Sequence, residues 1–305
     1  MNLNRLTSFF IASVFSVLSF SCSQEVSNPI NLESDNVNTF SRSIAVFNQI
    51  KIATYNAQNA FDPAKKTDLN SLAEAIKTMN VDVLALQEVK SKENLKSFVD
   101  KYLSTMQYTI INNESGKLAL LTKLPTTEVK TEIPSDISTN LLQVGLKAND
   151  NYKFNMFVGK IDAAKGSPLA DADKVEKVRQ FFRAYEKADR LSNYFLAGDF
   201  TGEPDSSEML LMLDPRASGL TFHDLVVEDI GLGKDIFSYS KANKKGRMDY
   251  LMPSGGMYQE YIRQTVQIDN KARVITPSNI FLKTSNHLPI IATFSTEKDI
   301  TVNKK

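Results

Sequence analysis

Residues 81–89 read VDVLALQEV, and this stretch decides the fold class. Residues 81–86 are short and almost wholly apolar, which is typical of a strand buried within a sheet. The run ends in the polar pair Gln87 and Glu88, so a carboxylate directly follows a buried strand. Ligands and catalytic groups of α/β proteins tend to lie at such strand ends. The stretch therefore predicts a buried sheet with polar chemistry at its edge.

The segments on both sides of this stretch alternate between strand and helix patterns. Apolar residues recur at helical spacing over 69–79, 95–102 and 175–185. Strands are expected at 50–55, 81–86, 108–111, 118–121, 141–146, 152–158, 194–197, 248–252 and 288–294. This order predicts an α/β (α+β) fold, a layered sandwich with antiparallel sheets rather than a doubly wound sheet.

Polar residues stand at the edges of several expected strands. They are Asn56, Glu88, Asp199, Asp249 and His287. Taken one by one, such residues are more often turn, cap or solvated surface groups. Together they supply oxygen ligands and one imidazole, which is the set that Mg²⁺-assisted phosphate chemistry requires.

The net charge and the cysteine count limit which partners and which metal sites the chain can have. The 305 residues include 36 Lys and Arg, 35 Asp and Glu, and one cysteine, Cys22. Arg5 is the only charged residue among the first 21, so the rest of the chain is formally neutral. A neutral chain argues against binding of nucleic acid or anionic lipid through net positive charge. The single cysteine excludes an internal disulfide and cysteine-based zinc sites.

The first 22 residues resemble an export signal. After Arg5 come 15 uncharged residues, too few to span a bilayer but typical of a signal-peptide core. Ser19 and Ser21 before Cys22 resemble a bacterial lipobox, which predicts cleavage and a lipid on Cys22; the alternative is a secreted protein with a free thiol. We expect a signal peptide at 1–21, a lipidated cysteine and flexible tether at 22–45, one domain at 46–297 and a polar tail at 298–305.

Six sequence blocks occur in one order along the expected domain. They are KIATYNAQNAFD (51–62), VDVLALQEV (81–89), GKLALLTKLP (116–125), LAGDFTGEPDS (196–206), GRMDYLMPS (246–254) and SNHLPIIATF (285–294). The set resembles the endonuclease/exonuclease/phosphatase superfamily. That resemblance implies a four-layered αββα sandwich with two packed, mostly antiparallel sheets and a site at one rim.

The resemblance also implies roles for single residues. Glu88 would bind the catalytic Mg²⁺, or Mn²⁺, and Asn56 would orient metal or phosphate beside it. Asp199 would hold or deprotonate the attacking water, while His287 would contact the phosphate and move a proton. Asp249 would hydrogen-bond His287 and favour its charged form. The substrate would be a phosphoester, with nucleic acid as one candidate, the only membrane contact would be the lipid on Cys22, and a monomer is expected.

Three positions depart from the family pattern. Lys160 stands where the family commonly has histidine, and it keeps a cation that can pair with phosphate without exchanging a proton. Thr201 replaces the asparagine of GDFN and keeps a hydroxyl donor. Asn286 replaces the aspartate before His287, so it keeps an oxygen ligand for metal but loses a negative charge.

These departures leave two hypotheses for function. The first is a metal-dependent phosphodiesterase, nuclease or phosphatase at the cell envelope, on the outer membrane where the cell has two. The second is a weakened or inactive member of the fold that binds a ligand or partner at the cell surface. Loss of one preorganised donor costs about 3 kcal/mol, roughly a hundredfold in rate. The retained carboxylates and His287 favour the enzyme.

Overall fold

The computed structural model describes residues 47–58, 60–64, 68–111, 118–130, 133, 137, 141–163, 171–233, 236–241, 244–268 and 284–297. The predictions for the signal peptide, for Cys22 and the tether, and for the tail at 298–305 lie outside these residues. Within them, no helix is both long enough and apolar enough to cross a bilayer. All of them belong to one compact unit, residues 31–305.

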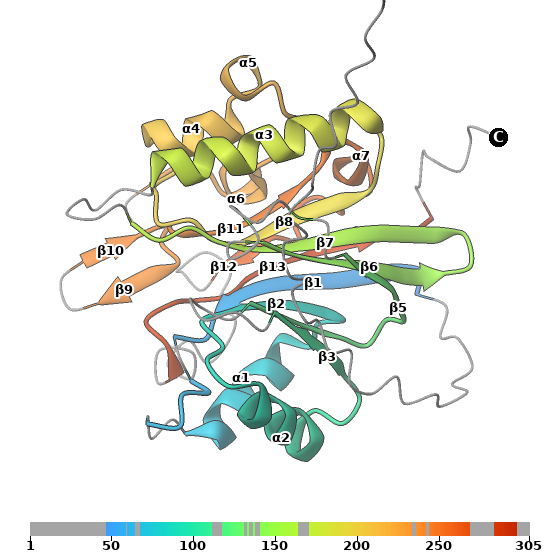
Figure 1. Ribbon diagram of the computed structural model, residues 1–305, viewed down its shortest axis with the longest axis vertical. Helices are drawn as coiled ribbons and strands as arrows, with labels where there is room; N and C mark the ends of the chain where they lie inside the picture. Colours follow the sequence, from blue (N-terminus) through green and yellow to red (C-terminus); the bar gives the residue numbers. More distant parts are fainter. Residues whose placement is uncertain are drawn as a thin grey trace, which may run out of the picture. The chain divides into compact units, whose positions relative to one another are not determined.

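The first sheet holds six strands and carries two helices on its outer face (Figure 1). Four of its five pairings are antiparallel, and only β1 and β2 run parallel. Helices α1 (Leu69–Met79) and α2 (Lys92–Tyr102) pack their apolar sides on it. In sheet order the strands are β12 (Gln267–Ile268), β13 (Ile290–Ser295), β1 (Gln49–Asn56), β2 (Val83–Gln87), β4 (Ala119–Thr122) and β3 (Gln107–Ile110).

The second sheet holds five strands beneath helices α3 (Ala172–Ala188) and α4 (Ser207–Leu213). Here β7 and β8 form the one parallel pair. In sheet order the strands are β11 (Asp249–Pro253), β8 (Tyr194–Asp199), β7 (Tyr152–Lys160), β6 (Leu141–Asn149) and β5 (Thr126–Lys130). The short helices α5 (Pro215–Ser218), α6 (Leu225–Asp229) and α7 (Gly255–Tyr258) complete this half.

A separate two-stranded ribbon lies at the left edge of Figure 1, formed by β9 (Tyr239–Lys241) and β10 (Lys244–Gly246). Its connection to the sandwich is through backbone contacts with residues 286–288. The Ser240 amide donates to the carbonyl of Asn286 (2.8 Å), and the Leu288 amide donates to the carbonyl of Ser238 (2.7 Å). The ribbon is therefore fastened directly beside His287.

Three apolar cores separate the four layers. Alternation along each strand sends one set of side chains to the neighbouring sheet and the other to the helices. On β1, for example, Ile50 and Ile52 face the second sheet, whereas Ala53 and Tyr55 face α1 and α2. Phe157 of β7 packs against Phe182 of α3 on the opposite outer face. The structure confirms the predicted α/β sandwich of two packed, mostly antiparallel sheets.

Local signals explain why the helices begin and end where they do. Asp68 caps α1 by accepting hydrogen bonds from the amides of Asn70 and Ser71. The helix ends at Asn80, which adopts the left-handed conformation that asparagine tolerates. Leu72 and Ile76 are buried between these ends. Truncating such a side chain typically costs about 2–5 kcal/mol, which is a large part of the free energy of unfolding of a whole domain.

Candidate active site

The two parallel strand pairs bring polar strand ends from both sheets together. On the first sheet, Asn56 of β1 stands in register with Gln87, directly before Glu88. On the second, Lys160 of β7 stands in register with Asp199 of β8. The amide nitrogen of Asn56 donates to Glu88 Oε1 (3.0 Å) and to Asp199 Oδ2 (2.8 Å). Glu88 of the first sheet and Asp199 of the second thus share one hydrogen-bond donor.

The orientation of the Asn56 amide follows from a neighbouring contact. Its Oδ1 accepts a hydrogen bond from the backbone amide of Gln58 (2.8 Å), so its nitrogen must face the two carboxylates. Asn56 therefore presents N–H groups rather than an oxygen to this part of the site. It orients the carboxylates of Glu88 and Asp199 by donating to them.

Three residues around the site adopt the left-handed backbone region. They are Gln58 (φ 48°), Glu88 (φ 59°) and Thr201 (φ 46°). This region is disfavoured for residues with a Cβ, and strain of this kind concentrates at functional sites. In each case the residue follows a strand of the site by one or two positions.

Two glycines allow β7 and β8 to approach closely just before the site. A Cβ on Gly198 would lie 1.8 Å from the carbonyl oxygen of Gly159, its partner across the strands. Only glycine fits there. This close approach places the next pair, Lys160 and Asp199, side by side.

Lys160 is the most heavily bonded cation of the site. Its ammonium lies 3.1 Å from Asp199 Oδ2, 3.2 Å from Glu88 Oε1 and 2.8 Å from Asp162 Oδ1. Burial works against the charge, but Asp199, Glu88 and Asp162 outweigh it and raise the pKa of Lys160 above its ordinary value. Lys160 is therefore a permanent positive charge between carboxylates of both sheets.

Asp199 is held ionised by the same contacts. Burial favours its protonated form, but the charges of Lys160 and His287 outweigh burial and lower the pKa of Asp199. Its Oδ1 accepts from the backbone amide of Thr201 (3.1 Å), with the Thr201 hydroxyl at 3.5 Å. Thr201 thus supports Asp199, and its assignment as a phosphate contact stays a prediction.

A second acid–base pair lies beside the first, in which burial raises the pKa of Asp249 although His287 opposes the shift. His287 Nδ1 is 2.8 Å from Asp249 Oδ2, and both residues are buried. Burial disfavours the imidazolium, but Asp249 and then Asp199 outweigh it and raise the pKa of His287. Ligand atoms of Asp199, Asp249 and His287 all lie within 4.8 Å of one another. The structure thus brings together the aspartates and the histidine that the sequence singled out.

Hydroxyl groups that the sequence did not single out position this second pair. Ser238 Oγ accepts from the amides of Asp249 (2.9 Å) and Met248 (3.0 Å). Ser285 Oγ donates to the carbonyl of Asn56 (2.7 Å) and accepts from the amide of His287 (3.0 Å). Isolated serines in loops carry no sequence signal for such roles. Asp162, two residues after Lys160, could have been found from the strand period of two.

Asn286 joins the site through its backbone. Its amide donates to Gln58 Oε1 (2.7 Å), and its carbonyl accepts from Ser240. Its assignment as a metal ligand stays a prediction, as does that of Glu88. Gln87 is fully buried and pairs with Thr54 (3.1 Å), which makes it a structural group.

Exposure rises across the cluster from one end to the other. Asp249 is fully buried, His287 and Asp199 are nearly so, and the side chains of Glu88 and Asp162 are 22% and 63% exposed. Solvent therefore reaches the cluster from the side of Lys160. The other histidine, His223, lies elsewhere, stacked on Tyr258 with ring centroids 3.5 Å apart.

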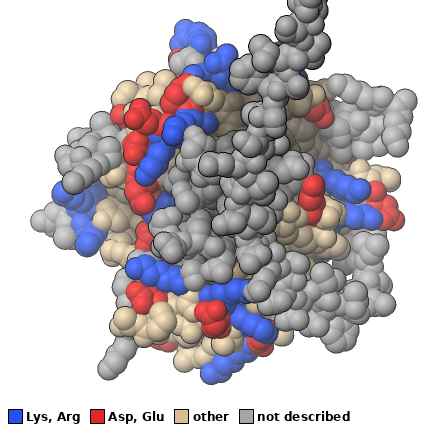
Figure 2. Space-filling model, viewed as in Figure 1, with Lys and Arg blue, Asp and Glu red and all other residues tan. Residues whose placement is uncertain are grey.

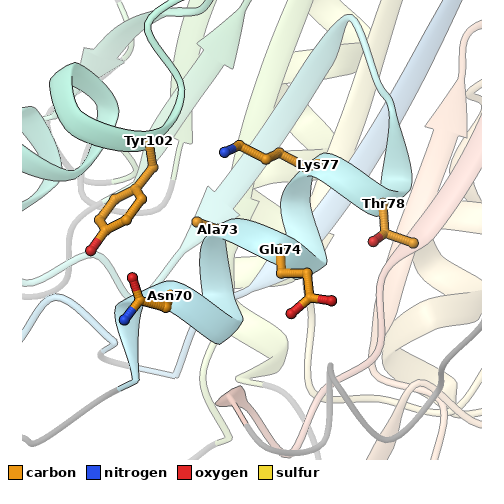
Figure 3. A pocket seen from close by; sticks show the side chains of 6 residues that line it. All are labelled: Asn70, Ala73, Glu74, Lys77, Thr78 and Tyr102. Carbon is orange, nitrogen blue, oxygen red and sulfur yellow. The ribbon is translucent and has the colours of Figure 1, made fainter.

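The donor set fits a divalent cation in its chemistry. Carboxylate oxygens are the protein ligands that Mg²⁺ and Mn²⁺ prefer, and those of Asp199 and Asp249 converge beside His287. A depression between α1 and α2 offers no such set: one carboxylate, Glu74, and no histidine line it (Figure 3). The rim of the two sheets is therefore the candidate active site.

Comparison with known proteins gives a matching family and similar folds. Residues 53–269 match the model of the Endonuclease/Exonuclease/phosphatase family. No curated protein matches the chain in sequence. Solved structures do resemble it: truncated Caenorhabditis elegans TDP2 has a TM-score of 0.60 at 16% identity, covering 81% of this chain and 98% of that one.

Two further structures resemble it to the same degree. An AP endonuclease from Archaeoglobus fulgidus has a TM-score of 0.59 at 15% identity, covering 80% of this chain and 99% of its own. D. rerio TDP2 complexed with single strand DNA product has a TM-score of 0.57 at 14% identity, covering 81% and 99%. At these identities the structures establish a shared fold.

Proposed function

The chain belongs to the endonuclease/exonuclease/phosphatase family, and from this premise we propose that it is a metal-dependent hydrolase of phosphate esters. Members of the family are typically metal-dependent phosphoesterases and nucleases. The observation that carries the proposal is the convergence of Asp199, Asp249 and His287 within 4.8 Å at the rim of the paired sheets. A carboxylate held ionised beside an imidazole supported by a second carboxylate supplies both halves of acid–base chemistry.

The contacts assign a distinct role to each side chain. Nδ1 of His287 is engaged with Asp249, so Nε2 is the ring nitrogen left to exchange a proton with the substrate. Asp199, ionised by its neighbours, orients or deprotonates the attacking water. Glu88 and Asp199 would hold the divalent ion, which when bound neutralises charge on the phosphate oxygens.

The β9–β10 ribbon favours a polyanionic substrate over a small one. Lys241, Lys244 and Lys245 are exposed on it, and basic groups gather at the left edge of Figure 2, where the ribbon lies in Figure 1. The ring of Tyr239, at its base, packs edge-on to His287 at 5.0 Å. A phosphodiester chain in the site would therefore pass near a local cluster of positive charge, even though the whole chain is nearly neutral. We propose a phosphodiester polymer, such as nucleic acid, as the substrate.

Hydrolysis assays with and without metal test the proposal. The purified protein is expected to cleave an oligonucleotide or a generic phosphodiester with added Mg²⁺ or Mn²⁺, and a chelator should abolish the activity. Absence of turnover across a panel of phosphodiesters and phosphomonoesters, with either ion, would contradict the proposed hydrolase function.

Substitutions on the ribbon test the substrate class. Changing Lys244 and Lys245 together to glutamine should lower kcat/KM for an oligonucleotide by about tenfold at low salt, and less at high salt, because phosphate contacts are screened. A small phosphodiester should be hydrolysed at the same rate as by the unsubstituted protein. An equal loss on both substrates would show that the ribbon acts on the site itself.

One observation favours a second candidate function. The ammonium of Lys160 already bonds carboxylate oxygens that a divalent ion would need. A binding module at the cell surface, without turnover, would keep the fold and the pocket while losing the metal. Absence of hydrolysis combined with absence of metal binding would favour this alternative.

Location is a separate part of the proposal and rests on the sequence of residues 1–22. We propose an extracytoplasmic protein anchored through a lipid on Cys22, placed at the cell envelope to act on external phosphoesters. Mass spectrometry of the membrane fraction should find lipid-modified Cys22. A product that is found only in the medium with an unmodified thiol would contradict the anchor.

A further inference from the structure

The oxygens that would bind a metal ion are occupied by donors of the protein itself. Glu88 Oε1 receives both the Asn56 amide (3.0 Å) and the Lys160 ammonium (3.2 Å). Asp199 Oδ2 receives the same two groups, at 2.8 and 3.1 Å. One neutral donor and one cation therefore converge on one oxygen of each carboxylate.

The remaining oxygen of Asp199 is engaged as well. Oδ1 accepts from the backbone amide of Thr201, whose position is set by the left-handed turn after β8. Asp199 thus has two donors at Oδ2 and, with the Thr201 hydroxyl at 3.5 Å, two at Oδ1, which fills the acceptor capacity of a buried carboxylate. A metal ion at Asp199 must displace one of these donors, and the flexible Lys160 side chain moves more easily than the backbone amide or the Asn56 amide fixed by Gln58.

The third partner of Lys160 gives the ammonium somewhere to go. Asp162 Oδ1 lies 2.8 Å from Nζ, and its side chain is 63% exposed. Lys160 can therefore leave the buried pair, keep one carboxylate partner and regain water. The charge it leaves behind on Glu88 and Asp199 is what a divalent ion would then neutralise.

We propose that the Lys160 ammonium is a built-in cation of the metal site, which competes with the divalent ion for Glu88 and Asp199 and so sets a low affinity for it. The ion then binds tightly only when a substrate phosphate adds further ligands and charge. The choice of a divalent ion rests on the proposed hydrolase function, but the competition itself is a property of binding.

Direct measurement of metal binding tests this inference. Mn²⁺ is titrated into the substrate-free protein, and the electron paramagnetic resonance signal of free Mn²⁺ reports the bound fraction. Lys160→Met keeps the length of the side chain and removes its charge, and it should bind Mn²⁺ about tenfold or more tightly than the unsubstituted protein because no cation has to be displaced. A change of this size lies within the usual range for two coupled binding events. Lys160→Arg keeps the charge and should remain as weak as the original.

A matched substitution controls for loss of any lysine. Lys123 pairs with Asp82 at 3.2 Å, away from the site, and Lys123→Met should leave Mn²⁺ binding unchanged. Where Lys160→Met folds poorly, Lys160→Gln replaces it. The rise in Tm on adding Mn²⁺ gives a second reading, since a ligand at free concentration L that binds the folded state stabilises it by RT ln(1 + L/Kd).

Mn²⁺ binding by Lys160→Met or Lys160→Gln that is no tighter than in the unsubstituted protein would overturn the inference. Hydrolysis is assayed separately. A rise in affinity without turnover in any variant would uphold the competition and count against the proposed hydrolase, so the two failures are distinguishable.

Discussion

The site contains two cation–carboxylate pairs that differ in how they are held and in what they can do. Lys160 and Asp199 stand on paired strands, and their register alone places them together. Asp249 also stands in strand register, opposite Asp199, but it and His287 are held in addition by the serine hydroxyls of two loops. Lysine keeps its charge at neutral pH, whereas histidine changes charge near it. Lys160 and Asp199 thus supply constant charges. His287 and Asp249, the loop-held pair, move the proton.

The largest effect should follow from removing the group that moves the proton. His287→Ala is expected to lower kcat/KM for phosphodiester hydrolysis by about 10³-fold, within the usual range for loss of an acid–base group. His223→Ala, remote from the site, should change it by less than about twofold. Steady-state kinetics of both variants measure this. Full activity in the His287 variant would break the assignment of roles between the two pairs.

Removing the fixed charge should cost stability. Lys160→Met leaves Glu88 and Asp199 without their cation, and unpairing a charge in such a buried setting costs about 3 kcal/mol in free energy of unfolding. Lys123→Met disrupts the more exposed pair with Asp82 and should cost less than about 1 kcal/mol. Denaturant unfolding of both variants gives the comparison. Equal costs would show that Lys160 contributes no more than a surface ion pair.

The loop-held pair should be sensitive to its serine. Ser238→Ala leaves the amides of Asp249 and Met248 without their acceptor, at a cost of about 2 kcal/mol. Ser192→Ala, which loses one exposed hydrogen bond to Asp189, should cost less than about 0.5 kcal/mol. Unfolding free energies test the difference, and kcat should fall only in the Ser238 variant. An unperturbed Ser238 variant would mean that the strands alone position Asp249.

The smallest effect is a pH dependence that separates the two pairs. The pKa of His287 is raised by its carboxylate neighbours, so its contribution to stability is complete below the ordinary value of about 6.5 and is lost as pH rises through the raised folded-state value. From pH 6 to 9 the metal-free protein should lose stability relative to His287→Gln. Parallel stability curves for the two proteins would contradict a charged imidazole in the folded state.

Much of the fold could be predicted because each layer repeats a simple pattern. The apolar period over 69–79 predicted α1 with the bounds that the structure shows. The ribbon β9–β10 was not predicted, since its sequence around Lys244 is polar on both faces and lacks the alternation of a half-buried strand. Strand β5, at the edge of its sheet, was missed for a related reason: residues 126–130 contain only one large apolar side chain, Val129.

The sequence allowed us to predict which residues form the candidate site, but fewer of the contacts between them. Polar residues at strand ends marked Asn56, Asp199 and His287 because such residues, taken together, supply the oxygen ligands and the imidazole of one site. That Lys160 bonds Glu88 across the two sheets could not be predicted, since it depends on how the sheets pack. The parts played by Ser238 and Ser285 depend on loop paths that no local pattern specifies.

The left-handed backbone of Glu88 (φ 59°) has a consequence for engineering. At a residue with a Cβ this conformation costs about 1–3 kcal/mol of strain, whereas glycine adopts it without that cost. A laboratory selection for heat resistance alone would reward Glu88→Gly wherever relief of this strain exceeds the loss of the contacts with Lys160 and Asn56, and it would discard the carboxylate in the process. Thermostable descendants of this chain would therefore need a second screen that keeps position 88 acidic.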